Sequence, residues 1–341
     1  FSYFKNSTNP PNFKSPKQLQ TYLTKLGYQK DLKTYLVSGQ AQSTNKLVLK
    51  TLSLKTPVAK DILDYREASK LLGTYVEPMS NAVKWTGNFN QTGTITGRYS
   101  SSKPNLQNIP NRTKIGRSIR KALTAKEGYR LIVSDQSQIE PRLFAYFSKD
   151  PKLITIFNQG NDFHTEVTNC IYGTTMPSAE QRFVGKTIGL ASLYGAGVPR
   201  LKQELFKYGV VMSYGQVTKV RDSVINTYKP AMQWANKFNS TATRAGYIDT
   251  LLKRRIPLVR GMNPVNTLIQ GSCSDILKVC MLNLYQAGYK IIATIHDEVV
   301  IEAIGLEYDV RKVKYIMENS VRLSSVPFKS DTCLVIAWGD K

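Results

Sequence analysis

Apolar positions along this chain recur either at helical spacing or in short continuous runs. Helical spacing of three and four residues predicts helices in several segments. These are residues 16–26, about 47–75 with an interruption near Pro57, 140–157, 178–194, further helix to about 245, and one more after Asn266. In the first segment Leu19, Tyr22, Leu23 and Leu26 are expected to share one apolar face.

The continuous apolar runs predict strands. Residues 130–134 (RLIVS) end at Asp135, and residues 291–295 (IIATI) are separated from 298–303 (EVVIEA) only by His296 and Asp297. The second pattern is typical of strand, tight turn and strand. Residues 85–110 are rich in Thr, Gly, Ser, Asn and Pro and predict strand with irregular loop, and residues 37–46 predict a polar loop. The order indicates an α+β fold in which one sheet is split by a helical insertion.

The net charge of the chain says more about its partners than its length does. The 341 residues allow about two domains at roughly 150 residues each. The 47 Lys and Arg against 24 Asp and Glu give a net charge of +23, and residues 1–120 carry 19 basic and 5 acidic side chains. Such an excess favours a polyanionic partner, nucleic acid first and acidic membrane second, although a merely solubilising surface is an alternative. No apolar stretch approaches the ~18 residues of a membrane span.

The cysteines suggest a cellular compartment, and the first residues suggest that the chain is part of a longer protein. Four cysteines without a CxxC pair fit no zinc pattern and predict reduced, mostly buried thiols. A reducing compartment follows, either the cytoplasm of a bacterium or phage-infected cell or an organelle matrix. The sequence starts at Phe1 without Met or a leader, so we expect the C-terminal part of a longer protein.

Two carboxylates stand at the ends of apolar strands, 162 residues apart. Asp135 ends the first run and Asp297 occupies the turn of the hairpin. Paired carboxylates without His or Cys ligands suit a hard cation such as Mg²⁺, and a two-ion site promotes in-line phosphoryl displacement. Two ordinary solvated turn aspartates are the alternative.

A second pattern lies on the helix over residues 180–195. Arg182, Lys186, Leu190 and Tyr194 follow one another at i+4 and therefore share one face. Two cations followed by an apolar and an aromatic side chain match a nucleotide whose phosphates meet the cations. An amphipathic helix with a solvated basic edge would give the same pattern.

Three segments contain the carboxylates and the helix face described above: SDQSQIEPR (134–142), RFVGKTIGLASLYG (182–195) and IHDEVV (295–300). Three more have a distinctive sequence: TGTITGRYSSSKPNLQNIP (92–110), DFHTEV (162–167) and NTLIQGSCSDILK (266–278). Together these segments resemble family A DNA polymerases, the family of bacterial DNA polymerase I, and the first three look like its motifs A, B and C. The family fold is a right hand, with an antiparallel palm sheet, a helical fingers insertion and a helical thumb.

The resemblance implies a domain division and partners. Residues 1–80 would be a partial thumb with its junction, 81–157 and 263–341 the two parts of the palm, and 158–262 the fingers. The implied partners are primer–template DNA and dNTPs, with upstream exonuclease and thumb domains in a full-length monomeric protein that has no membrane partner. No exonuclease is expected in this chain.

The resemblance also assigns metal and catalytic residues. Asp135, Asp297 and the carbonyl of Gln136 would hold two Mg²⁺ ions, with Mn²⁺ as a substitute. Lys186 would protonate the leaving pyrophosphate, and Glu298 would support the metal site.

The expected nucleotide and DNA contacts complete the set. Arg182, Lys186 and His164 match residues that grip the triphosphate, and Glu140 matches the steric gate against ribonucleotides. Tyr194, Leu190 and Gln138 would complete the dNTP pocket. The DNA contacts are expected at Arg98, Asn105, Gln107, Asn108, Asn266, Gln270, His296, Arg66 and Lys70. For Arg66 and Lys70 a solvated surface is an equal alternative, and for His296 a structural hydrogen-bonding role is another.

The chain departs from the family pattern at three residues and in one segment. Gln136 replaces the usual Tyr, Pro141 the usual Leu, and Leu190 an aromatic ring, and the segment from Arg255 to Asn266 is short.

Two alternative functions stay open. A single-subunit RNA polymerase shares the carboxylates and a similar helix, but Glu140 and PNLQNIP favour DNA synthesis. A catalytically weak module that only holds DNA would not need Asp135, Asp297, Arg182 and Lys186 together.

Overall fold

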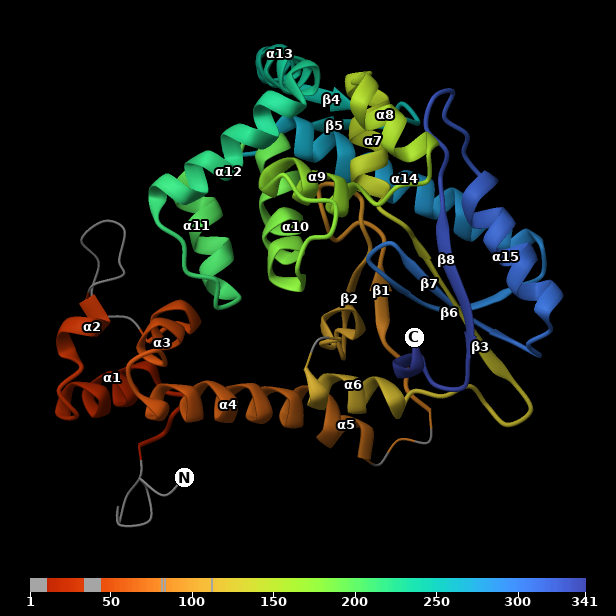
Figure 1. Ribbon diagram of the computed structural model, residues 1–341. Coiled ribbons are helices and arrows are strands. Elements are labelled where there is room, and N and C mark those ends of the chain that lie inside the picture. Colours follow the sequence, from red (N-terminus) through yellow and green to blue (C-terminus); the bar gives the residue numbers. More distant parts are fainter. Residues whose placement is uncertain (1–10, 34–43, 81, 83, 112) are drawn as a thin grey trace. The chain divides into compact units, whose positions relative to one another are not determined.

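The fold is described from a computed structural model, which covers residues 11–33, 44–80, 82, 84–111 and 113–341 (Figure 1). The chain divides into two compact units, which we describe separately. The first consists of residues up to Trp85 together with Gln203–Val211, and the second of Thr86–Lys202 and Met212–Lys341.

The first unit is helical, as predicted. Its elements are α1 (Pro16–Lys25), α2 (Gln29–Lys33), α3 (Lys46–Leu52), α4 (Pro57–Leu71), the π-helical turn η2 (Leu72–Val76) and α5 (Glu77–Ser80). The helix expected over 47–75 breaks before Pro57, because Thr56 caps α4 and Pro57 takes its first position. Leu19 and Leu23 are buried as expected, but Leu26 is 44% exposed, since α1 ends before it. Most of the loop predicted over 37–46 lies outside the described residues.

The second unit contains both small hairpins, the main sheet and the remaining helices. Before the main insertion lie β1 (Asn88–Asn90), β2 (Ser100–Ser102), η3 (Leu106–Asn108), α6 (Lys114–Lys121) and β3 (Arg130–Gln136). Then follow α7 (Ile139–Ser148), α8 (Pro151–Asn158), α9 (Phe163–Tyr172), α10 (Ala179–Leu193), α11 (Val198–Lys207, which runs into the first unit), α12 (Tyr214–Thr227) and α13 (Lys229–Ala245). The last elements are β4 (Tyr247–Asp249), β5 (Arg255–Pro257), α14 (Pro264–Gln286), β6 (Lys290–Ile295), β7 (Glu298–Ala303), α15 (Glu307–Asn319), β8 (Ser330–Val335) and η4 (Trp338–Asp340).

The main sheet has the order β6-β7-β3-β8, with antiparallel pairs throughout. The strand β3 precedes the helical insertion and both of its neighbours follow it, so the predicted split sheet is confirmed (Figure 1). Leu131, Ile132 and Val133 are all buried, because β3 is a central strand and α15 packs against it. The strand β8, which sequence reasoning did not identify, forms the second edge.

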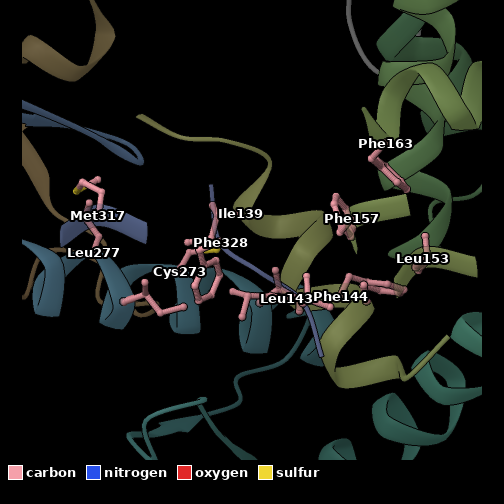
Figure 2. Packing of buried hydrophobic residues seen from close by; sticks show 14 of the residues in the cluster. Ile139, Leu143, Phe144, Leu153, Phe157, Phe163, Cys273, Leu277, Met317 and Phe328 are labelled. Carbon is pink, nitrogen blue, oxygen red and sulfur yellow. The ribbon is translucent and has the colours of Figure 1, made fainter. Parts of the chain in front are cut away.

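The helices around α7 form the main core (Figure 2). Figure 2 shows Leu143 and Phe144 of α7 between Cys273 of α14 on one side and Phe157 and Phe163 on the other. The single helix expected over 140–157 is two helices, because Lys149 has a left-handed backbone (φ 55°) and ends α7. Asp150 then accepts hydrogen bonds from the N–H groups of Lys152 and Leu153 and begins α8.

All four cysteines are free thiols. Cys273 and Cys280 are buried as expected and Cys333 is partly buried, but Cys170 is exposed near the end of α9. In the part of the chain that the structure describes, no helix has the length and hydropathy of a membrane span.

Candidate active site

The sheet brings Asp135 and Asp297 to one end of neighbouring strands. Asp135 lies on β3 opposite Glu298 of β7, and Asp297 precedes Glu298 in the turn of the β6–β7 hairpin. The Gln136 N–H donates to the Asp297 carbonyl over 3.2 Å, which fixes the turn against β3. His296 supplies the left-handed residue of this turn (φ 55°) and is exposed. Strand register and this turn therefore bring the two carboxylates to the same end of the sheet.

Both carboxylates lose hydration and repel each other. Burial raises the pKa of Asp135 to about 6; Lys341 opposes this shift, and the charges of Glu298, Asp297 and Asp331 add to it. Burial likewise raises the pKa of Asp297 to about 6, opposed by Arg98 and increased by Glu140. A bound cation would relieve both effects, so the two residues fit a hard divalent metal.

The described residues offer few other metal ligands. Among residues 11–33, 44–80, 82, 84–111 and 113–341, no cluster of three or more His, Cys, Asp or Glu is arranged to hold a metal. A metal here would need backbone oxygen, water or substrate oxygen in addition to the two carboxylates. The Gln136 side chain lies in the core, where its Nε2 is 3.3 Å from the Cys280 sulfur, so only its backbone is available at the site.

Glu298, expected to support the metal site, is tied elsewhere. Its Oε1 accepts a hydrogen bond from Trp338 Nε1 and its Oε2 one from Lys341 Nζ, each over 2.7 Å. Both oxygens of this buried carboxylate are therefore engaged with the last elements of the described chain.

Arg98 connects the carboxylate pair to the residue expected to act as the steric gate. Its Nη2 lies 2.7 Å from Glu140 Oε1 and 3.7 Å from Asp297 Oδ1. The second Glu140 oxygen accepts from the Tyr194 hydroxyl over 3.1 Å. Burial, and after it the neighbouring Glu140 charge, raises the pKa of Tyr194 well above its usual value, so this hydroxyl stays protonated. Glu140 is thus held between a cation and a hydrogen-bond donor.

Sequence reasoning missed the residues that hold the Arg98 backbone. Ser274 Oγ donates to the Gly97 carbonyl over 2.6 Å, and Arg254 Nη2 donates to the Thr96 carbonyl over 2.8 Å. Arg254 is itself paired with the buried Asp275, with Nε to Oδ1 at 2.7 Å. The available signal was the Ser and Asp in NTLIQGSCSDILK, polar residues in an otherwise buried helix.

The helices α9 and α10 carry the expected triphosphate contacts. They approach closely because α10 has Gly185 where a Cβ would overlap the Thr168 side chain of α9. Arg182 Nη2 lies 3.0 Å from Asp162 Oδ1, whereas Lys186 is exposed on the same helix face. Burial, followed by the Lys186 charge, lowers the pKa of His164 to about 4, so its imidazole is neutral near pH 7. Its Nδ1 is buried and has no partner among the described residues.

Polar contacts join these helices to the sheet region. Gln138 donates to Asp162 Oδ2 over 2.8 Å and accepts from the Phe163 N–H over 2.9 Å, so its amide is used at the start of α9. Asn263, also missed in the sequence, donates to the Tyr194 carbonyl over 2.8 Å and caps α14. Leu190 packs partly buried against the main core.

The expected DNA contacts lie in several places. Gln270 donates to Asn266 one turn earlier on α14 (3.2 Å), Gln107 donates to the Thr294 carbonyl of β6 (3.3 Å), and Asn105 caps the turn that contains Asn108. Arg66 and Lys70 belong to the first unit. There Arg66 donates to the carbonyls of Phe13 and Thr44, each over 2.7 Å, and Lys70 is exposed.

A cavity of about 680 Å³ is lined by residues other than those of the candidate site. It opens at the far end of α7, and its lining includes Tyr146, Lys149, Asp249 and Lys253. The candidate site itself lies at strand ends and helix faces outside this cavity.

Comparison with known proteins shows which family the chain belongs to. The sequence profile of DNA polymerase family A matches residues 3–340, so the chain belongs to this family. Thermostable DNA polymerase I of Thermus aquaticus is 34% identical over 98% of the chain, and DNA polymerase I of Deinococcus radiodurans is 36% identical over 96%. The chain spans only 42% and 36% of these relatives.

A solved structure supports the fold. The polymerase domain of Pol1 from M. smegmatis, in complex with a DNA primer–template and dNTP, superimposes with a TM-score of 0.85. It is 30% identical, and the match covers 99% of this chain and 63% of the other. The predicted α+β right-hand polymerase fold is therefore confirmed.

Proposed function

We propose that this chain is the polymerase part of a template-directed DNA polymerase, which adds dNTPs to a primer 3′-OH and releases pyrophosphate. The observation that carries the proposal is the convergence of Asp135 and Asp297 at one end of the sheet, both with pKa values raised to about 6. Family membership and the relatives named DNA polymerase I support it.

Asp135, Asp297 and the Gln136 carbonyl would hold the divalent ions, Mg²⁺ with Mn²⁺ as a substitute. When bound, the ions would lower the pKa of the attacking hydroxyl and stabilise the charge on the α-phosphate. The strand register and the Gln136–Asp297 hydrogen bond hold the backbones of the two aspartates in place. That fixed geometry avoids reorganisation during the reaction.

The α9–α10 face would bind the triphosphate. Arg182 and Lys186 lie one turn apart, and neutral His164 can donate a hydrogen bond without adding charge. Lys186 is the group we propose to protonate the leaving pyrophosphate. Arg182 would exchange its partner Asp162 for phosphate oxygens.

Glu140 would select deoxyribose by its bulk. Its carboxylate is held by Arg98 and Tyr194 and therefore cannot rotate away without loss of two hydrogen bonds. Arg98, Asn266, Gln270 and His296 would contact the primer–template, where minor-groove acceptors are common to all base pairs. The solved relative with DNA primer–template and dNTP supports both classes of partner.

Primer extension with Mg²⁺ tests the proposal, with dNTPs compared with NTPs on the wild-type chain and on Asp297→Ala. Extension by dNTPs alone, abolished in the variant, is the expected outcome. Extension with NTPs would indicate RNA synthesis instead. Tight, salt-sensitive DNA binding without extension would show a module that only holds DNA.

A further inference from the structure

The segment from Ala337 to Lys341 is fixed against α6 and the residues just after it by several independent contacts. The Trp338 N–H donates to the Leu123 carbonyl over 2.9 Å, and the Arg120 guanidinium lies 4.0 Å from the centre of the Trp338 ring. Gly339 lies so close to α6 that a Cβ would come within 2.6 Å of the Lys121 nitrogen. A segment packed this closely positions the residue that follows it.

That residue, Lys341, places an ammonium on the catalytic face. Its Nζ lies 2.7 Å from Glu298 Oε2, and its side chain is only 25% exposed. Glu298 is the direct β7 partner of Asp135 on β3, and side chains of such antiparallel partners lie on the same face of a sheet. Lys341 therefore lies on the side of the sheet that Asp135 faces, with its ammonium paired to the residue directly opposite Asp135.

The same contacts restrain the third carboxylate of this region. Glu298 lies beside Asp297 in sequence and opposite Asp135 in the sheet, so it is close enough to compete for a cation. Trp338 and Lys341 engage one oxygen each, so both oxygens of Glu298 already have a partner. Removal of the ammonium would both free one Glu298 oxygen and increase the negative charge around Asp135.

We propose that Lys341 is a positioning residue that weakens and confines divalent-metal binding, by pairing with Glu298 and by placing a positive charge beside Asp135. This inference rests on the proposed metal site at Asp135 and Asp297. If Lys341 only supported packing, its removal would weaken divalent-metal binding. If its charge competes with the metal, its removal should strengthen that binding.

Mn²⁺ binding to the full chain without DNA, followed by the electron paramagnetic resonance signal of free Mn²⁺, tests the sign directly. Lys341→Ala should bind Mn²⁺ about three- to tenfold more tightly, the scale expected for one nearby charge that water screens well. Lys341→Arg should resemble wild type. Lys314→Ala removes an equal charge from an exposed position on α15 and should change nothing.

Primer extension supplies a second measurement. The Mg²⁺ concentration for half-maximal rate should fall by a similar factor in Lys341→Ala. Unchanged or weaker Mn²⁺ binding by Lys341→Ala would overturn the inference and leave Lys341 a purely structural contact. If Asp297→Asn binds Mn²⁺ as well as wild type does, the metal site itself fails, and the proposed function and this inference fall together.

Discussion

The two halves of the candidate site are built in different ways. The anionic half, Asp135 and Asp297, lies on neighbouring segments of a sheet, partly buried and with little freedom to move. The cationic half, Arg182 and Lys186, lies on the exposed face of one helix. Two polar contacts, Gln138 with Asp162 and Tyr194 with Glu140, connect α9 and α10 to the start of α7, which follows β3 in sequence.

This difference shows which half of the site destabilises the folded protein when no metal is bound. Like charges brought together in a poorly hydrated place destabilise the folded state, and the raised pKa values of both aspartates express that cost. Exposed cations keep their hydration, so Arg182 and Lys186 cost little. Substitutions in the anionic half should therefore change both activity and stability, and substitutions in the cationic half should change mainly activity.

The strongest test of the anionic half is Asp135→Asn. The amide retains the shape but cannot hold a divalent ion as a carboxylate does, so the primer-extension rate should fall at least about a thousandfold. Asp249→Asn makes the same chemical change on the exposed β4–β5 hairpin and should leave the rate within about twofold of wild type. Equal activity of the two variants would mean that Asp135 is not a metal ligand.

Lys186→Gln tests the cationic half. Loss of an acid and of a phosphate contact should lower the single-turnover rate about a hundredfold, while the melting temperature stays unchanged because Lys186 is exposed. Lys219→Gln on α12 provides the matched exposed change. A large loss of thermal stability in Lys186→Gln would contradict the contrast between the two halves.

Glu140→Ala tests the contact between the halves. Without the carboxylate beside the sugar, discrimination against ribonucleotides should fall roughly ten- to a hundredfold. Tyr194→Phe removes only the hydrogen bond to Glu140 and should change discrimination by less than about threefold. Incorporation of NTPs relative to dNTPs measures both, and a larger effect for Tyr194→Phe would point to the hydrogen bond instead of bulk.

The smallest predicted effect is on stability, and it distinguishes the two halves of the site most clearly. The folded pKa of Asp135 is about 6 against about 4 in an unfolded chain, so the folded state binds more protons between these values. Wild-type stability should therefore fall as pH rises from 4 to 6 and remain low above 6. Without metal, Asp135→Asn should be more stable than wild type by about 1–2 kcal/mol at pH 7 and equal to it near pH 4. Denaturant melts at the two pH values measure this, and a pH-independent difference would contradict it.

Much of this arrangement follows from sequence because strand ends and helix faces are local patterns. Asp135 and Asp297 stand at the ends of apolar runs, and Arg182 and Lys186 recur at i+4, so their placement needs only strand and helix geometry. The family resemblance then supplies the order of the segments.

Other contacts depend on tertiary packing that no local pattern contains. The hydrogen bond from Arg254 to the Thr96 carbonyl joins residues 158 positions apart. Trp338 and Lys341 contact Glu298 only because β8, the strand before them, belongs to the same sheet as β7. Lys149 ends α7 through its left-handed backbone, which composition does not favour at a lysine. Such contacts are decided by which surfaces meet, and the sequence shows only the residues that take part.

The place of β3 in the sheet has a consequence for the order of folding. Its partners in β7 and β8 begin at Glu298 and Ser330, so a nascent chain that has reached the end of the helical insertion still lacks both neighbours of the strand that carries Asp135. Pairings of such long sequence separation close slowly, because loop-closure entropy is lost before the contacts form. The aspartate pair therefore comes together only late in synthesis, and an incomplete chain exposes β3 without the second carboxylate.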